Sequence, residues 1–151
     1  MLSCYADWGI ITVTSMLGVT AVNDKVKYWI DLAHDDLDTA KLLCKKKRLL
    51  HMGFFCHMVV EKSLKAVVAN KTGELPPKIH DLKKLADKGD LLNRFSKEQL
   101  NFLIELEPLN IESRYPEYKS NIASTLTAEK CKQICKETET FLCWIKKELE
   151  K

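Results

Sequence analysis

The segment Leu49–Asn70 reads LLHMGFFCHMVVEKSLKAVVAN, and it decides the fold. Its apolar side chains recur at helical spacing but cover much of the circumference instead of one narrow stripe. A helix of that kind needs neighbours on several sides, so the pattern predicts the central, most buried helix of a bundle. Lys71, Gly73 and the pair Pro76-Pro77 then end the helix, because proline lacks the backbone donor and clashes with the preceding turn.

Four further helices are predicted around this one, and residues 25–151 show no strand pattern. Residues 25–44 carry an apolar stripe and are followed by four cations at 45–48, where the helix dipole favours positive charge. A short helix is predicted over 81–88. A further helix is predicted to begin at a Ser96–Gln99 capping box and to stop near Pro108. The last predicted helix is capped by Thr127 and runs to the C-terminus. Residues 110–126 are predicted to form a loop. The predicted fold class is all-α, an up-and-down bundle of four to five helices.

Length and composition restrict the class of protein. The chain has 151 residues, with 24 Lys+Arg against 21 Asp+Glu and a formal net charge of +3. These values describe one globular domain and exclude collagen, a disulfide mini-protein, a low-complexity chain and a multi-domain enzyme. The mildly basic balance permits a phosphate-bearing partner.

Residues 1–24 differ from the rest of the chain. Their Thr, Val and Ile content predicts extended rather than helical structure, so we interpret them as an atypical N-terminal extension, disordered or non-native, ahead of a helical domain over 25–151. On this hypothesis translation begins naturally near Met16 or Val22. The uncharged run from Trp8 to Val22 is too short for a membrane span, and residues 1–24 lack the basic residues of a signal peptide. The expected location is the cytoplasm, without a membrane partner.

Four short motifs occur in a characteristic order: Trp29 and Ala33 with Asp36-Leu37 and Ala40, then Glu61-Lys62-Ser63-Leu64-Lys65-Ala66, then Pro77-Lys78-Ile79-His80-Asp81-Leu82, then Ser113-Arg114-Tyr115-Pro116. From about Lys25 to Lys151 the chain thereby resembles HEPN domains, the nucleotide-binding domains of higher eukaryotes and prokaryotes, in their prokaryotic stand-alone type. The resemblance implies a helical bundle of four to five helices that forms a homodimer and acts with a minimal nucleotidyltransferase partner. Some members of the family are RNase toxins, and the partner is then the antitoxin of a toxin–antitoxin pair.

The motif that carries RNase activity in this family is incomplete here. The resemblance implies an arginine followed four to six residues later by a histidine, and Arg114 is followed at those positions by Lys119, Ser120 and Asn121. Metal-free RNA cleavage needs a base for the 2′-hydroxyl proton, and histidine has the appropriate pKa near neutrality. Lys119 would replace it only if burial or a neighbouring cation lowered its pKa by several units. We therefore favour a binding module over an enzyme, with no catalytic residue assigned beyond Arg114 as a weak candidate.

The candidate ligand-binding residues are Arg114, Tyr115, Tyr118, Glu61, Lys62, Lys65 and His80. Arg114 would hold a phosphate bidentately while a neighbouring tyrosine ring stacks on a base; its alternative is a salt bridge to Glu112, Glu117 or an aspartate of the first helix. Tyr118 would line the same cleft or be a half-buried surface ring. Following the resemblance, Glu61, Lys62 and Lys65 would face a nucleotide phosphate in the dimer cleft.

Other interpretations of these residues stay open. Glu61 and Lys65 are four residues apart with the acid first, the favourable order for an ion pair within a helix. His80 precedes the short helix, so it would cap that helix, orient the loop, or act as a displaced base near Arg114.

No metal or cofactor site is predicted. Cys131 and Cys135 are four apart on a helix, but a structural zinc site needs four ligands, and Cys44, Cys131 and Cys135 lie on apolar stripes as small hydrophobic residues do. No phosphate-cradling glycine loop is present, so the chain would recognise a nucleotide rather than activate it. Three functions remain: a phosphate-binding module with a nucleotidyltransferase partner, an RNase toxin with a degenerate motif, and a non-catalytic dimeric adaptor.

Overall fold

The part of the chain that the structure describes contains five α-helices. The computed structural model describes residues 17–112, 115 and 124–151, with side chains from Asp24 onward except that of Glu112. The helices are α1 (Leu17–Lys45), α2 (Leu49–Thr72), α3 (Leu82–Lys88), α4 (Lys97–Glu112) and α6 (Ala128–Leu149), with a 3-10 turn at Leu92–Arg94. The described residues contain no strand. The prediction of an all-α bundle is confirmed.

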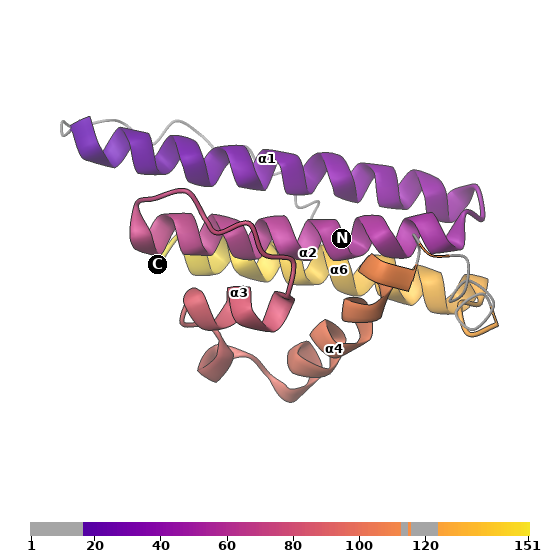
Figure 1. Ribbon diagram of the computed structural model, residues 1–151. Helices are drawn as coiled ribbons and strands as arrows, with labels where there is room; N and C mark the ends of the chain where they lie inside the picture. Colours follow the sequence, from indigo (N-terminus) through magenta and orange to yellow (C-terminus); the bar gives the residue numbers. More distant parts are fainter. Residues whose placement is uncertain (1–16, 113–114, 116–123) are drawn as a thin grey trace.

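The helix α2 lies at the centre of the bundle. It contacts α1, α3, α4 and α6, and α1 runs antiparallel to it along its whole length (Figure 1). Helix α6 lies on the far side of α2 in that view, while α3 and α4 pack below it. The central position predicted from the apolar circumference of residues 49–70 is therefore confirmed.

The core explains this arrangement. Fully or almost fully buried side chains on α2 face every neighbour: Met52, Cys56, Val59, Val60, Leu64, Ala66, Val68 and Ala69. On α1, Ala33 and Ala40 are two turns apart and have no exposed surface. Small side chains at helical spacing let two helix backbones approach closely, so α1 and α2 pack along their length.

Two helix boundaries differ from the predictions. Helix α1 begins at Leu17, so the extended structure predicted for residues 17–24 is wrong there. No proline interrupts that stretch, and a helix already nucleated propagates at one hydrogen bond per added residue. Helix α4 also continues through Pro108 to Glu112, four residues past its predicted end. Leu109 follows the proline, is buried, and packs on Gly53 of α2, which stabilises the last turn.

The predicted helix caps are present. The Ser96 hydroxyl accepts a hydrogen bond from the Gln99 amide at 3.2 Å, and the Gln99 side-chain oxygen accepts from the Ser96 amide at 2.9 Å. The Thr127 hydroxyl accepts from the Lys130 amide at 3.1 Å at the start of α6. Each cap satisfies a backbone donor that the first turn of a helix leaves without a partner.

Replacing Ser96 with alanine is expected to lower the free energy of unfolding by about 1 kcal/mol, since the Gln99 amide loses its acceptor. Urea unfolding followed by circular dichroism measures the loss. Lys97→Ala, at the next and exposed position, is the control and should change stability by less than about 0.5 kcal/mol. Equal values for the two variants would show that the capping box contributes nothing.

Candidate functional site

A polar stripe crosses the central helix. His57, Glu61 and Lys65 are spaced by four residues on α2, so they share one face, and all three are buried. The Lys65 ammonium lies 2.7 Å from Glu61 Oε1, which confirms the predicted ion pair within the helix. It also lies 5.3 Å from the centre of the Trp29 ring on α1. Buried charges normally have partners, and here the ammonium has both a carboxylate and an aromatic face.

Glu61 connects this stripe to the loop before α3. His80 Nδ1 lies 3.1 Å from each oxygen of the Glu61 carboxylate. The Glu61 side chain is 2% exposed and the His80 side chain is 60% exposed. The imidazole is therefore held by a buried carboxylate while much of the ring is exposed to solvent. A carboxylate that accepts from Nδ1–H fixes the tautomer and leaves Nε2 as the acceptor.

The loop is fixed on both sides of His80. Asp81, not His80, caps α3, because its side chain accepts from the Lys84 amide at 2.8 Å, and this hydrogen bond lowers the pKa of Asp81. Glu107 of α4 accepts from the Leu82 amide at 2.5 Å, so α4 holds the first turn of α3. Of the three roles considered for His80, the structure rules out capping; the contact with Glu61 orients the loop.

Lys62 points to a different helix. Its ammonium lies 2.5 Å from Asp36 Oδ2 on α1, and both side chains are largely buried. Burial raises the pKa of Asp36, and the hydrogen bond and charge of Lys62 oppose that rise. Lys62 therefore joins α1 to α2.

The comparison with protein-family models is specific. Residues 26–149 match the model of the HEPN domain. The chain belongs to the HEPN domain family. The match covers every motif that carried the resemblance. Neither the comparison with curated proteins nor that with solved structures gives a significant match.

Arg114, the arginine of the RNase motif, lies outside the described residues, as do Tyr118 and Lys119. Of that segment, Tyr115 is described, and its side chain is exposed. The structure brings together Glu61, Lys65 and His80 and places Lys62 on Asp36. It does not describe how Arg114 is placed relative to them.

Three members of this network, Trp29, His57 and Glu107, were not predicted from the sequence. Trp29 counted toward the family resemblance and not as a partner of Lys65, and Glu107 was not singled out. The spacing of His57, Glu61 and Lys65 was a visible signal, because residues four apart share a helix face. Glu107 Oε2 on α4 lies 3.9 Å from His57 Nε2. The two residues are far apart in the sequence, so no local pattern indicates this contact.

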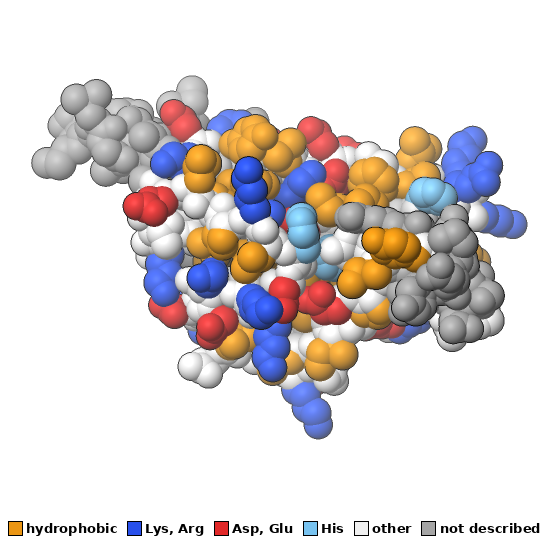
Figure 2. All heavy atoms as spheres, in the orientation of Figure 1, with side chains coloured by type: hydrophobic (Ala, Val, Ile, Leu, Met, Phe, Trp, Pro, Cys, Tyr) orange, Lys and Arg blue, Asp and Glu red, His pale blue; other side chains and the backbone are white. Residues whose placement is uncertain are grey.

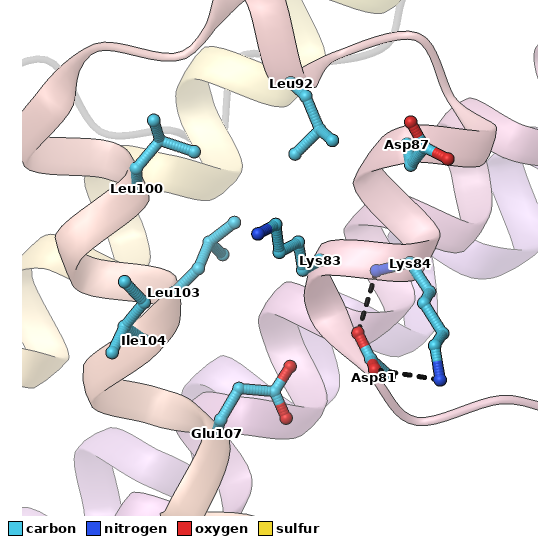
Figure 3. Close-up of a pocket in the computed structure, with 9 residues that line it drawn as sticks. All are labelled: Asp81, Lys83, Lys84, Asp87, Leu92, Leu100, Leu103, Ile104 and Glu107. Atoms are coloured by element: carbon cyan, nitrogen blue, oxygen red, sulfur yellow. Dashed lines mark hydrogen bonds and ion pairs between the residues drawn. The ribbon is translucent and has the colours of Figure 1, made fainter.

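A pocket adjoins the network between α3 and α4. It has a volume of about 700 Å³, and Figure 3 shows Lys83 of α3 reaching into the space between the two helices, opposite the leucines of α4. Asp81 and Glu107 line the pocket and also hold the first turn of α3, through their hydrogen bonds with the Lys84 and Leu82 amides. Burial raises the pKa of Glu107. The volume is within the range of small-molecule sites.

The described free thiols lie mainly in the core. Cys44, Cys56, Cys131 and Cys135 are free, and all but Cys44 are buried. Burial raises the pKa of Cys131 to about 11, as befits a small hydrophobic residue of the core. In the described part of the chain no group of three or more His, Cys, Asp or Glu side chains is placed to hold a metal ion. Among the described helices, none combines the length and apolarity needed to cross a membrane.

Proposed function

We propose that this HEPN domain binds a phosphate-bearing ligand, a nucleotide or RNA, and does so as a homodimer that acts with a nucleotidyltransferase partner. The observation that carries the proposal is the exposed His80 ring held on the buried Glu61 carboxylate. A polar ring that is held by a buried carboxylate and exposed to solvent is suited to bind a ligand, because little side-chain freedom is lost on binding. Arg114 and Tyr115 supply the bidentate phosphate contact and the stacking ring.

The remaining candidates take supporting roles in this proposal. Glu61 and Lys65 neutralise each other, and Lys62 is neutralised by Asp36. These three residues therefore hold His80 and the α1–α2 pair in place, while His80, Arg114, Tyr115 and Tyr118 contact the ligand.

Exposed apolar residues on α4 support self-association. Ile104 is 69% exposed and Ile111 is 56% exposed, and they lie two turns apart on the same face. Apolar side chains that share an exposed face are typical of surfaces covered by a partner. Sedimentation at tens of micromolar should give the mass of a dimer; a monomer would contradict this part of the proposal.

The binding proposal predicts a large effect at His80. His80→Ala should weaken mononucleotide binding, measured by isothermal titration calorimetry, by about tenfold, which corresponds to the loss of one good hydrogen bond. Glu61→Gln should weaken it less, because the amide still accepts from the ring. The control Lys97→Ala should bind as the wild type does. Unchanged binding in His80→Ala would contradict a role for this residue.

The same geometry favours a second candidate function, metal-independent RNA cleavage. His80 supplies an imidazole that the arginine motif lacks, and Glu61 fixes it as a base-and-orienter pair. Nε2 would accept the 2′-hydroxyl proton as the 2′-oxygen attacks phosphorus to form a 2′,3′-cyclic phosphate. The P–O5′ bond breaks, and the departing 5′-oxygen takes a proton from water to become a hydroxyl. The test is incubation of labelled RNA with the protein without added metal. Cleavage by the wild type that is lost in both His80→Ala and Arg114→Ala would favour this function. If Arg114→Ala and His80→Ala change neither binding nor cleavage, the non-catalytic adaptor remains.

A further inference from the structure

A run of four cations, Lys45, Lys46, Lys47 and Arg48, forms the turn between α1 and α2. No acidic residue lies between Asp38 and Glu61. All four side chains are exposed, and none forms an ion pair with a residue that the structure describes. Figure 2 shows Lys and Arg side chains gathered at the end of the bundle where Figure 1 places this turn.

Several other lysines on α1 and α2 have acidic partners. Lys41, one turn before the run, is paired with Glu139 of α6 at 2.7 Å, and Lys62 and Lys65 are paired as described above. The positive charge of the turn is therefore concentrated in a group of side chains that the fold does not neutralise. We call Lys45–Arg48 the basic turn.

The backbone of the basic turn is unusual for its sequence. The Lys47 amide donates to the Cys44 carbonyl at 3.1 Å and the Arg48 amide to the Leu43 carbonyl at 2.9 Å. This is a Schellman motif, in which the residue after the helix adopts the left-handed conformation. Lys47 has φ 57°, a conformation that glycine adopts readily and that strains residues with a Cβ.

The end of α2 shows the usual solution in the same chain. Gly73 occupies the left-handed position there, with φ 70°. After α3 the left-handed residue is Asp90, with φ 56°. Lys47, at the corresponding position of α1, has a Cβ as Asp90 does, and it places a charge at the centre of the basic turn.

Helix α6 adds a further cation at this end. Burial raises the pKa of Cys44, in the last turn of α1, and the charge of the nearby Lys132 opposes that rise. Lys132 is exposed on α6 and forms no ion pair with a described residue. The cations thus extend from the turn onto a second element.

From these observations we infer that the basic turn, with Lys132, binds the phosphodiester backbone of an RNA strand without reading its sequence. The inference rests on the proposed function and extends it: the nucleotide site takes one phosphate group, and the basic turn takes the phosphates of the adjoining strand. Flexible, fully charged lysines suit such contacts, because each neutralises a phosphate and releases counterions without requiring a base.

The test compares a long ligand with a short one. Labelled oligouridylate and uridine monophosphate are titrated with the wild type, Lys47→Gly and the double variant Lys46→Gln/Lys47→Gln over a series of salt concentrations. Lys47→Gly should weaken oligouridylate binding about threefold and raise the urea midpoint of unfolding, since glycine relieves the strain at this φ. In the double variant the slope of log K against log salt should fall by about 0.7 for each cation removed.

The controls make failure interpretable. Lys147→Gln, an exposed cation near the other end of α6, should leave both ligands bound as by the wild type. Uridine monophosphate binding should be unchanged in every variant. If the double variant binds oligouridylate with the same affinity and the same salt slope as the wild type, the inference about the basic turn is overturned but the proposed function is not. If the wild type binds neither ligand, both are overturned. If the double variant loses binding to phosphatidylserine vesicles but binds RNA as the wild type does, the basic turn binds a membrane surface, and the inference is overturned.

Discussion

Replacing Glu61 with alanine is expected to lower the free energy of unfolding by about 3–5 kcal/mol. The Lys65 ammonium lies 2.7 Å from this carboxylate, and its side chain is 8% exposed. Without Glu61 the charge stays buried with the Trp29 ring in place of an anion, and His80 loses its anchor. Urea unfolding followed by circular dichroism measures the change, with the slope of the transition checked for two-state behaviour.

An exposed pair provides the matched control. Lys27 and Asp31 form an ion pair at the same spacing on α1, with side chains 63% and 57% exposed. Asp31→Ala should therefore change stability by less than about 0.5 kcal/mol. The double variant Glu61→Leu/Lys65→Met should recover much of the loss, because no unpaired charge remains. A loss below about 1 kcal/mol in Glu61→Ala would contradict the buried network.

The second large effect is expected in the core. Leu64 on α2 has no exposed surface, and replacing it with alanine should lower the free energy of unfolding by about 3–5 kcal/mol through lost apolar burial and the cavity left behind. The control is Leu42→Ala on α1, where the side chain is 56% exposed and the expected change is below about 0.5 kcal/mol. Similar losses in both variants would show that α2 is not the central helix.

Both effects are large beside the stability of a small domain, which is typically about 5–15 kcal/mol. They also separate two kinds of contribution. Leu64→Ala removes packing alone, whereas Glu61→Ala removes the anchor of His80 as well. We expect Leu64→Ala to keep nucleotide binding under conditions in which it is folded, and Glu61→Ala to weaken binding about tenfold, as His80→Ala does.

Helical periodicity predicted the architecture because this fold is built mainly from local patterns. The apolar circumference of residues 49–70, the Ser96–Gln99 capping box and the Thr127 cap each depend on residues within a few positions of one another. The two boundary errors have the same origin. Local helix propensity does not indicate that Leu109 packs on Gly53 and so extends α4 beyond Pro108. It also does not indicate that α1 extends back to Leu17.

The candidate site could be predicted only in part. The ion pair between Glu61 and Lys65 follows from spacing on one helix, and it is present. The contact of His80 with Glu61 and that of Glu107 with Leu82 join different elements, so the sequence contains no local signal for them. Arg114 and Tyr118 stay predictions from the family resemblance, because they lie outside the described residues.

The most direct test of the central claim is a titration of labelled oligouridylate and of uridine monophosphate with the wild type and with Arg114→Ala, at one salt concentration and without added metal. We expect the wild type to bind both ligands saturably. Arg114→Ala should bind them about tenfold more weakly, and Lys97→Ala should bind them as the wild type does. No binding by the wild type, or equal binding by the wild type and Arg114→Ala, would contradict the claim.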